Sequence, residues 1–191
     1  WEIVPTKHVT KKKKSNAGPK PTIGDTPENK KLKEVHAQKK RVWAEEQRNL
    51  KSQLVNTDLC SWKFRYNGKE RCIGEVSEPS KPLKFIGGVD ISFIKNNEID
   101  ACASFVVLSF PQLQLVYENL KMVKLTEPYI PSFLAFRECP PLVALIKESL
   151  KDSRCPTPDI LLVDGNGELH TRGYGAACHF GNLLSMPTIG V

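Results

Sequence analysis

The clearest hydrophobic pattern lies between Phe85 and Phe110, where two apolar runs flank the polar segment Lys95–Glu98. Their lengths are typical of β-strands, and the polar segment is typical of a turn. Strands are therefore predicted over 85–93, 99–110 and 113–125, joined by short links, one of which contains Pro111-Gln112. Short links predict an antiparallel meander. Ala101 to Val107 is nearly all apolar, which predicts a strand covered on both faces.

Helical and strand-like segments alternate after the meander. Ser132 is a candidate cap for a helix that Pro140-Pro141 should interrupt, with a second helix running to about Leu150. The next elements are a strand over Asp159–Val163, a helix over Ala176–Leu184 and a strand over Met186–Val191. A meander followed by this alternation predicts an α/β fold, with a mixed sheet of antiparallel and parallel strands and flanking helices.

The segments before residue 85 are less regular. Residues 1–31 are rich in Lys and Pro with few apolar side chains, which predicts a disordered basic tail. A helix is expected over 32–55, within one domain that spans 32–191. Its apolar face contains Trp43, Gln47, Leu50 and Leu54. Residues 56–84 are expected to be loop-rich, with a hairpin at Asn67-Gly68.

Charge is concentrated at the start of the chain. The net charge of +7 resides in residues 1–40, which hold eleven Lys and four acidic residues. The cluster Lys11–Lys14 suits a solvated linker, a nuclear import signal or a phosphate-binding arm. No apolar run is long enough for a membrane span, and no signal peptide is evident, so we expect an intracellular protein. The six cysteines form no CxxC pair, which favours reduced thiols over a zinc site.

Three carboxylates stand out by their positions. Asp90 lies inside a predicted strand, where an unpaired charge is unfavourable unless something compensates it. Glu138 lies on a predicted helix, and Asp164 ends a predicted strand beside Gly165-Asn166-Gly167. Convergence of the three would favour Mg²⁺, with Mn²⁺ as a substitute, and phosphodiester hydrolysis. Taken singly, Asp164 suits a turn before glycine better than a site, and Glu138 suits a surface ion pair better, whereas Asp90 suits either.

Further polar candidates follow Asp164 in the chain. Gly173 and Gly175 would let the backbone approach a ligand, and Arg172 could bind phosphate. His170 suits either a site or an idle loop position, and His179 is expected to be packed in the core. Tyr129, held between Pro128 and Pro131, suits either stacking on a displaced base or anchoring in the core. The two prolines are expected to hold both Tyr129 and Ile130 outward.

The ordered set of these motifs resembles the endonuclease V family. The resemblance rests on Gly87–Phe93, on Pro128–Pro131 with Phe133–Glu138, on Leu161–Gly167 and on His170–Gly173. It implies a ribonuclease H-like fold and a Mg²⁺-dependent nuclease that cleaves inosine-containing RNA or DNA at the second phosphodiester bond 3′ to the deaminated adenine.

The resemblance also implies roles for individual residues. Asp90, Glu138 and Asp164 resemble the metal-binding catalytic acids. Pro128, Tyr129, Ile130 and Pro131 resemble a wedge beside the modified base. Gly165, Asn166, Gly167, His170, Arg172 and Gly173 resemble the lining of the base pocket. A monomer that binds nucleic acid in the nucleus or nucleolus and the cytoplasm is expected.

Family members continue beyond Gly190-Val191 into a Lys-bearing loop and a last metal-site residue. The expectation from the sequence is therefore an incomplete form with weak or no activity. Two alternatives stay open: an inactive isoform that binds nucleic acid, and a structural α/β domain whose acids lie on the surface.

Overall fold

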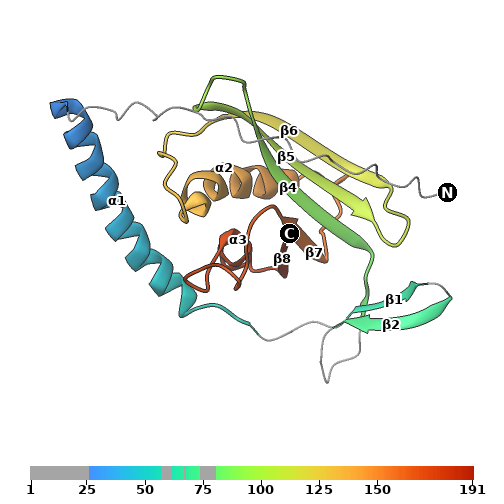
Figure 1. The fold of residues 1–191 in the computed structure, drawn as a ribbon. Coiled ribbons are helices and arrows are strands. Elements are labelled where there is room, and N and C mark those ends of the chain that lie inside the picture. Colours follow the sequence, from blue (N-terminus) through green and yellow to red (C-terminus); the bar gives the residue numbers. More distant parts are fainter. Residues whose placement is uncertain (1–25, 57–61, 67, 74–80) are drawn as a thin grey trace, which may run out of the picture.

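A five-stranded mixed sheet forms the centre of the fold (Figure 1). The computed structural model describes residues 26–56, 62–66, 68–73 and 81–191. The strands are β4 (Phe85–Phe93), β5 (Asp100–Ser109), β6 (Leu115–Lys124), β7 (Ile160–Val163) and β8 (Thr188–Gly190), in the order β6-β5-β4-β7-β8. β4, β5 and β6 pair antiparallel, whereas β4, β7 and β8 pair parallel. The predicted meander and mixed α/β sheet are confirmed.

Two helices, α2 (Leu134–Ser149) and α3 (Ala176–Leu184), pack on the sheet and close the main core. That core includes Phe105, Leu145, Leu161 and Phe180, all nearly inaccessible to solvent. Along β5 the fully buried residues alternate with half-buried ones. The prediction of a strand covered on both faces is therefore wrong for the described residues. Among the described residues, the second face of β5 is half-buried and no second layer covers it, which is enough to favour an apolar run.

Helix α2 is continuous through Pro140 and Pro141, so the predicted interruption is wrong. A proline removes one backbone hydrogen bond, but the apolar face of α2 is buried on both sides of the pair and holds the helix together. The predicted Ser132 cap is also wrong. The N-cap position is Phe133, whose side chain caps nothing, and Ser132 adopts a left-handed backbone with φ of 70°.

Helix α1 spans Pro27–Lys51, so it begins inside the expected tail and ends before residue 55. Thr26 caps it, because the Thr26 hydroxyl accepts a hydrogen bond from the Asn29 amide, and Pro27 suits the first helical turn. Trp43 and Gln47 are its buried residues, as its amphipathic pattern predicts. The expected disorder of residues 1–25 and the Lys11–Lys14 cluster lie outside the described residues.

A small second sheet precedes the main one. β1 (Trp62–Tyr66) and β2 (Lys69–Ile73) pair antiparallel around Gly68, which confirms the predicted hairpin, although Asn67 lies outside the described residues. β3 (Lys81–Pro82) pairs parallel with β1.

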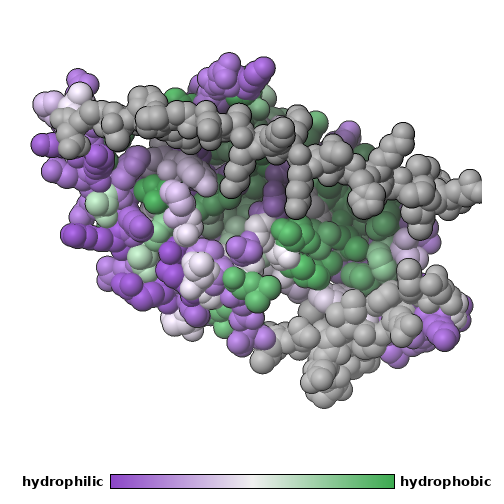
Figure 2. Space-filling model, in the orientation of Figure 1, coloured by the Kyte–Doolittle hydropathy of each residue, from purple (hydrophilic) through white to green (hydrophobic). Residues whose placement is uncertain are grey.

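The surface combines hydrophilic and hydrophobic regions (Figure 2). Within the described residues no helix is long and apolar enough to cross a membrane. The thiols that the structure describes, Cys102, Cys139, Cys155 and Cys178, are all free. Cys60 and the side chain of Cys72 lie outside the described part of the chain.

Candidate metal and nucleic-acid site

Strand register places two of the three predicted acids side by side. β4 and β7 run parallel, with Val89 opposite Val163. Asp90 and Asp164 each follow these partners directly, so they occupy neighbouring positions where β7 ends. Both side chains are exposed. This edge of the sheet is the position at which parallel α/β sheets present ligand-binding groups.

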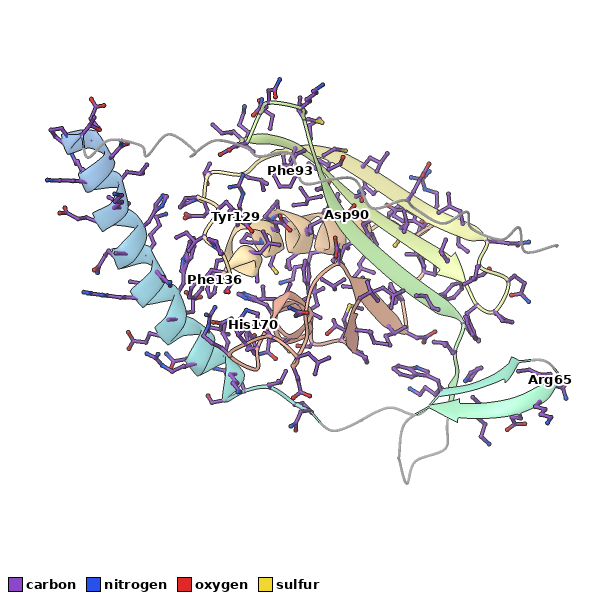
Figure 3. The ribbon with its side chains drawn as sticks, viewed as in Figure 1. Arg65, Asp90, Phe93, Tyr129, Phe136 and His170 are labelled. Atoms are coloured by element: carbon purple, nitrogen blue, oxygen red, sulfur yellow. The ribbon has the colours of Figure 1, made fainter. Side chains whose placement is uncertain are left out.

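The third acid, Glu138, comes from α2, one turn after the helix begins at Leu134. Asp90, Glu138 and Asp164 line one cavity of about 190 Å³, together with Gly165 and apolar side chains such as Phe93 and Phe180. Acids that lie far apart in the sequence therefore meet at one place. Figure 3 shows Asp90 on the sheet, in front of the helices.

The electrostatics of the cavity reflect this gathering of like charges. Burial raises the pKa of Glu138 to about 7, against the opposing charge of Arg137, and the carboxylates of Asp90 and Asp164 raise it further. One oxygen of Asp90 accepts a hydrogen bond of 2.7 Å from the Ile91 amide. The cavity therefore favours whatever brings positive charge to it, either a proton on Glu138 or a cation.

The donor set suits a hard divalent cation, because all three groups offer carboxylate oxygens. Within the described residues, however, no three Asp, Glu, His or Cys side chains are close enough together to hold a metal ion. Mutual repulsion favours such a spread in a protein without a cation. The residues fit the chemistry of Mg²⁺ or Mn²⁺, and coordination by all three requires their side chains to move closer together.

The predicted wedge segment divides into an outward and an inward residue. Tyr129 is 59% exposed, as expected, whereas Ile130 is only 6% exposed and packs with Trp43, Phe133 and Phe136. The prediction that both side chains point outward is therefore wrong for Ile130. Since Ile130 anchors the segment to the core, Tyr129 is presented on a fixed support (Figure 3).

The loop after Asp164 is held by its own backbone. The Gly167 carbonyl accepts hydrogen bonds from the amides of His170 and Gly175, at 3.3 and 3.0 Å. A Cβ on Gly175 would lie 2.0 Å from the Asn166 carbonyl oxygen, and a Cβ on Gly190 would lie 2.2 Å from the Gly165 carbonyl oxygen. Both glycines are required by this close approach. Sequence reasoning missed Gly190, although a glycine inside a predicted strand is a signal of close backbone contact.

Arg172 is occupied by contacts within the protein. Its guanidinium donates hydrogen bonds to the Gln47 side chain and to the Ser132 carbonyl, and it lies 4.1 Å from the centre of the Phe133 ring. Nδ1 of His170 accepts a hydrogen bond of 3.2 Å from the Arg172 amide. Burial, and then the charge of Arg172, lower the pKa of His170. These contacts tie the 170–173 loop to α1 and to the segment after Pro131.

Of the predicted substrate-binding residues in the described chain, Gly165 is the one that lines the carboxylate cavity. Pro128, Tyr129, Ile130, Pro131, Asn166, Gly167, His170, Arg172 and Gly173 lie outside its lining. Sequence reasoning missed the contribution of Phe93 and Arg137. The Arg137 guanidinium lies 5.6 Å from the Phe93 ring centre and donates to the Glu98 carbonyl, which ties α2 to the β4–β5 turn beside the cavity.

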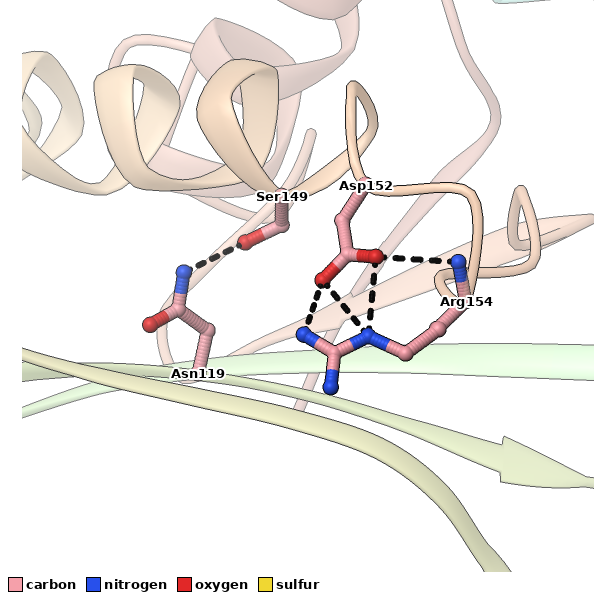
Figure 4. Close-up of polar contacts among 4 residues, drawn as sticks. All are labelled: Asn119, Ser149, Asp152 and Arg154. Carbon is pink, nitrogen blue, oxygen red and sulfur yellow. Dashed lines mark hydrogen bonds and ion pairs between the residues drawn. The ribbon is translucent and has the colours of Figure 1, made fainter.

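A second cavity, of about 420 Å³, lies beside β6 and is lined in part by Asn119, Asp152 and Arg154. Arg154 pairs with Asp152 at 2.7 Å and lowers the pKa of Asp152 to about 2 (Figure 4), which leaves Glu118 as the other charged group in the lining. Asn119 donates to Ser149 at 3.0 Å and joins β6 to the end of α2. This cavity therefore lacks the clustered like charges of the first.

Comparison with known proteins agrees with the predicted resemblance. A family model described as Endonuclease V matches residues 69–191. The chain is similar to endonuclease V of Homo sapiens, with 44% identity over 152 residues that cover 78% of this chain and 49% of that protein. It thus spans about half the length of that relative.

Solved structures are similar as well. The catalytic domain of human endonuclease V aligns with a TM-score of 0.67 and 41% identity, covering 80% of this chain and 57% of that chain. A Ciona intestinalis endonuclease V, in complex with a 23mer DNA containing an inosine followed by a ribo-adenosine, aligns with a TM-score of 0.66 and 33% identity. That match covers 80% of this chain and 56% of the other. The predicted ribonuclease H-like fold is confirmed by these similarities.

Proposed function

The chain belongs to the endonuclease V family, and from that premise we propose that it is a divalent-metal-dependent endonuclease that hydrolyses inosine-containing RNA or DNA. The observation that carries the proposal is the single cavity lined by Asp90, Glu138 and Asp164. Support for the substrate class comes from the Ciona intestinalis relative, whose structure contains inosine-bearing DNA.

Each acid has a part in this proposal. Asp90 and Asp164 hold the cation from the sheet, and Glu138 holds it from α2, with Mg²⁺ as the proposed ion and Mn²⁺ as a substitute. When bound, such an ion activates water and stabilises the leaving oxygen of a phosphodiester. Since burial and like charges raise the pKa of Glu138 to about 7, Glu138 releases a proton when a cation binds near neutral pH.

The two loops supply the proposed recognition of the base. Tyr129, exposed on its anchored segment, stacks beside the displaced purine. The Gly165–Gly167 and His170–Gly173 loops form the proposed lining of the base pocket. Hypoxanthine has a donor at N1 and an acceptor at O6, opposite to adenine, and backbone carbonyls and amides can read that reversal. We propose that cleavage falls at the second phosphodiester bond 3′ to the inosine.

The contacts of Arg172 define the role that we propose for this residue. Its guanidinium is bonded to the Gln47 side chain and the Ser132 carbonyl, so in this proposal it positions the His170–Gly173 loop rather than binding phosphate itself. His170 is held in the same loop by its hydrogen bond from the Arg172 amide.

A cleavage assay tests the proposal directly. Single-stranded RNA with one inosine is incubated with Mg²⁺ and either the unmodified chain or Asp90→Asn, with adenine-containing RNA as substrate control. Glu45→Gln, on the exposed surface of α1, controls for loss of an acid elsewhere. We expect a product from the unmodified chain and Glu45→Gln and none from Asp90→Asn. Equal product from all three proteins would refute the assignment.

A second candidate function is an inosine-binding protein with weak or no cleavage. Its support is that, in the described residues, no trio of potential ligands is within reach of one ion. Retained, inosine-dependent RNA binding without product would favour this candidate. For either function we propose a monomer, located in the nucleus or nucleolus and the cytoplasm. Comparing a fluorescent fusion of the unmodified chain with one carrying Lys11–Lys14→Ala would test the location.

A further inference from the structure

The C-terminal half of α1 is fastened to both loops that the proposed function uses. Lys39 pairs with Glu127 beside the Tyr129 segment. On the other loop, Lys51 Nζ donates to the Arg172 carbonyl at 3.0 Å, and Gln47 donates to the Tyr174 carbonyl at 2.6 Å. Trp43 stacks on Phe136 with ring centres 5.2 Å apart. The helix is therefore held firmly against the proposed recognition loops.

The N-terminal half of α1 has no fully buried residue and continues beyond these contacts. Figure 1 shows α1 at the edge of the molecule, and Figure 2 shows it as a largely hydrophilic region. Six basic side chains fall within an arc of about 100° when residues advance by about 100° along a helix. Two of them are Lys33 and Lys51, and Lys51 is already bonded to the Arg172 carbonyl. The other four define a basic stripe. This basic stripe consists of Lys30, Lys40, Arg41 and Arg48. The acids of α1, Glu28, Glu34, Glu45 and Glu46, fall outside that arc.

No ion pair among the described residues compensates the charge of the basic stripe. Elsewhere on the described surface, Lys39, Lys63, Lys121 and Lys124 are each paired with an acid. Lys30 and Arg41 have acids four residues later, Glu34 and Glu45, yet neither forms an ion pair in the described part of the chain. A row of uncompensated cations attracts a polyanion, and it spans about 27 Å from Lys30 to Arg48.

We propose that the basic stripe of α1 binds the phosphate backbone of the single-stranded nucleic acid that flanks the inosine. This inference rests on the proposed function, because α1 lies against the two loops assigned to the base. The stripe adds affinity without base specificity, since phosphate contacts are independent of sequence. A lipid surface is less favoured, because the exposed apolar residues Leu32, Val35 and Val42 project from the side of α1 opposite the stripe.

Salt-dependent binding tests the proposal. Fluorescence anisotropy of a labelled single-stranded RNA is measured without divalent cations at several KCl concentrations, with inosine-containing and adenine-containing versions. The stripe variant is Lys30→Gln, Lys40→Gln, Arg41→Gln and Arg48→Gln. The matched control variant is Lys81→Gln, Lys84→Gln, Lys147→Gln and Lys151→Gln, four exposed lysines outside α1. Helical content by circular dichroism confirms that each variant folds.

We expect the slope of log K against log salt to become shallower by about 3 in the stripe variant, from about 0.7 for each lost phosphate contact. The loss should be equal for both RNAs, and the control variant should keep the original slope. Equal slopes for the stripe and control variants would overturn the inference but leave the endonuclease proposal intact. If the slopes are as expected but the cleavage assay gives no inosine-dependent product, the endonuclease proposal is refuted and the proposed binding surface stands. Binding of the unmodified chain to anionic phosphatidylserine vesicles, without RNA binding, would also overturn the inference.

Discussion

The stability of the metal-free protein should depend on pH through two groups that act in opposite directions, half-buried Glu138 and buried His179. Burial raises the pKa of Glu138 from 4.5 to about 7, and the charges of Asp90 and Asp164 add to the increase. Burial lowers the pKa of His179 from 6.5 to about 4. His179 contacts Phe136 edge-on, at 5.1 Å between ring centres, and its buried Nδ1 has no hydrogen-bond partner among the described residues.

The signs follow from which state binds the proton. Folded Glu138 keeps its proton to higher pH than the unfolded chain does, so its contribution to stability is lost as the pH rises from about 4.5 through about 7. Folded His179 resists protonation, so its contribution is present above pH 6.5 and is lost as the pH falls toward about 4. Between pH 7.5 and 5.0, buried His179 changes the free energy of unfolding by about 2 kcal/mol. Half-buried Glu138 changes it in the opposite direction by about 1 kcal/mol, because solvent screening weakens the effect of its shift.

Single variants should therefore separate the two effects. Relative to the unmodified chain, Glu138→Gln should lose about 1 kcal/mol more on acidification from pH 7.5 to 5.0. His179→Phe should instead gain about 2 kcal/mol over the same change. Other titrating groups, including His170, act in all the proteins and cancel in the comparison.

Urea unfolding with EDTA present measures these changes, with tryptophan fluorescence reporting on the buried Trp43 and Trp62. His36→Gln, in the outer part of α1, is the control and should follow the unmodified chain. The reasoning is refuted if both variants keep the pH dependence of the unmodified chain, or if both change it in the same direction.

Two further predictions concern the loops. Tyr129→Ala should weaken binding of inosine-containing RNA by about 1–3 kcal/mol, the usual effect of losing one stacking aromatic, with an unchanged melting temperature because the side chain is exposed. Anisotropy and melting curves test this, and an unchanged affinity would contradict the stacking role. Gly175→Ala should destabilise the fold by about 2 kcal/mol or more, since its Cβ would lie 2.0 Å from the Asn166 carbonyl oxygen. A urea unfolding midpoint for Gly175→Ala equal to that of the unmodified chain would contradict the close approach.

The hydrophobic pattern along the sequence predicted those elements whose boundaries are set by neighbouring residues. The limits of β4 and α3 agree with the apolar runs at Phe85–Phe93 and Ala176–Leu184. The position of Asp164 at the end of β7 also follows from sequence, because a strand pattern stops there at a glycine. The pairing of Val89 with Val163 then brings Asp90 and Asp164 together.

Features set by distant contacts were not predictable in this way. Ile130 is buried because Trp43 from α1 packs with it, and no local signal distinguishes it from the exposed Tyr129. Arg172 is held by Gln47 and by Ser132, residues far away in sequence. Pro140 and Pro141 stay helical because the sheet buries the flanking apolar residues of α2. Tertiary packing overrides local preference in each case.

The most direct measurement of the central claim is a Mn²⁺ titration followed by thermal and urea unfolding. At about one hundred times Kd, binding to the folded state alone adds about 2.7 kcal/mol to the stability of the unmodified chain. The double variant Asp90→Asn, Asp164→Asn should lose this increase, and in EDTA it should be at least as stable as the unmodified chain, because like-charge repulsion on Glu138 is relieved. A chain that Mn²⁺ does not stabilise, or a double variant that keeps the increase, would contradict a shared cation site.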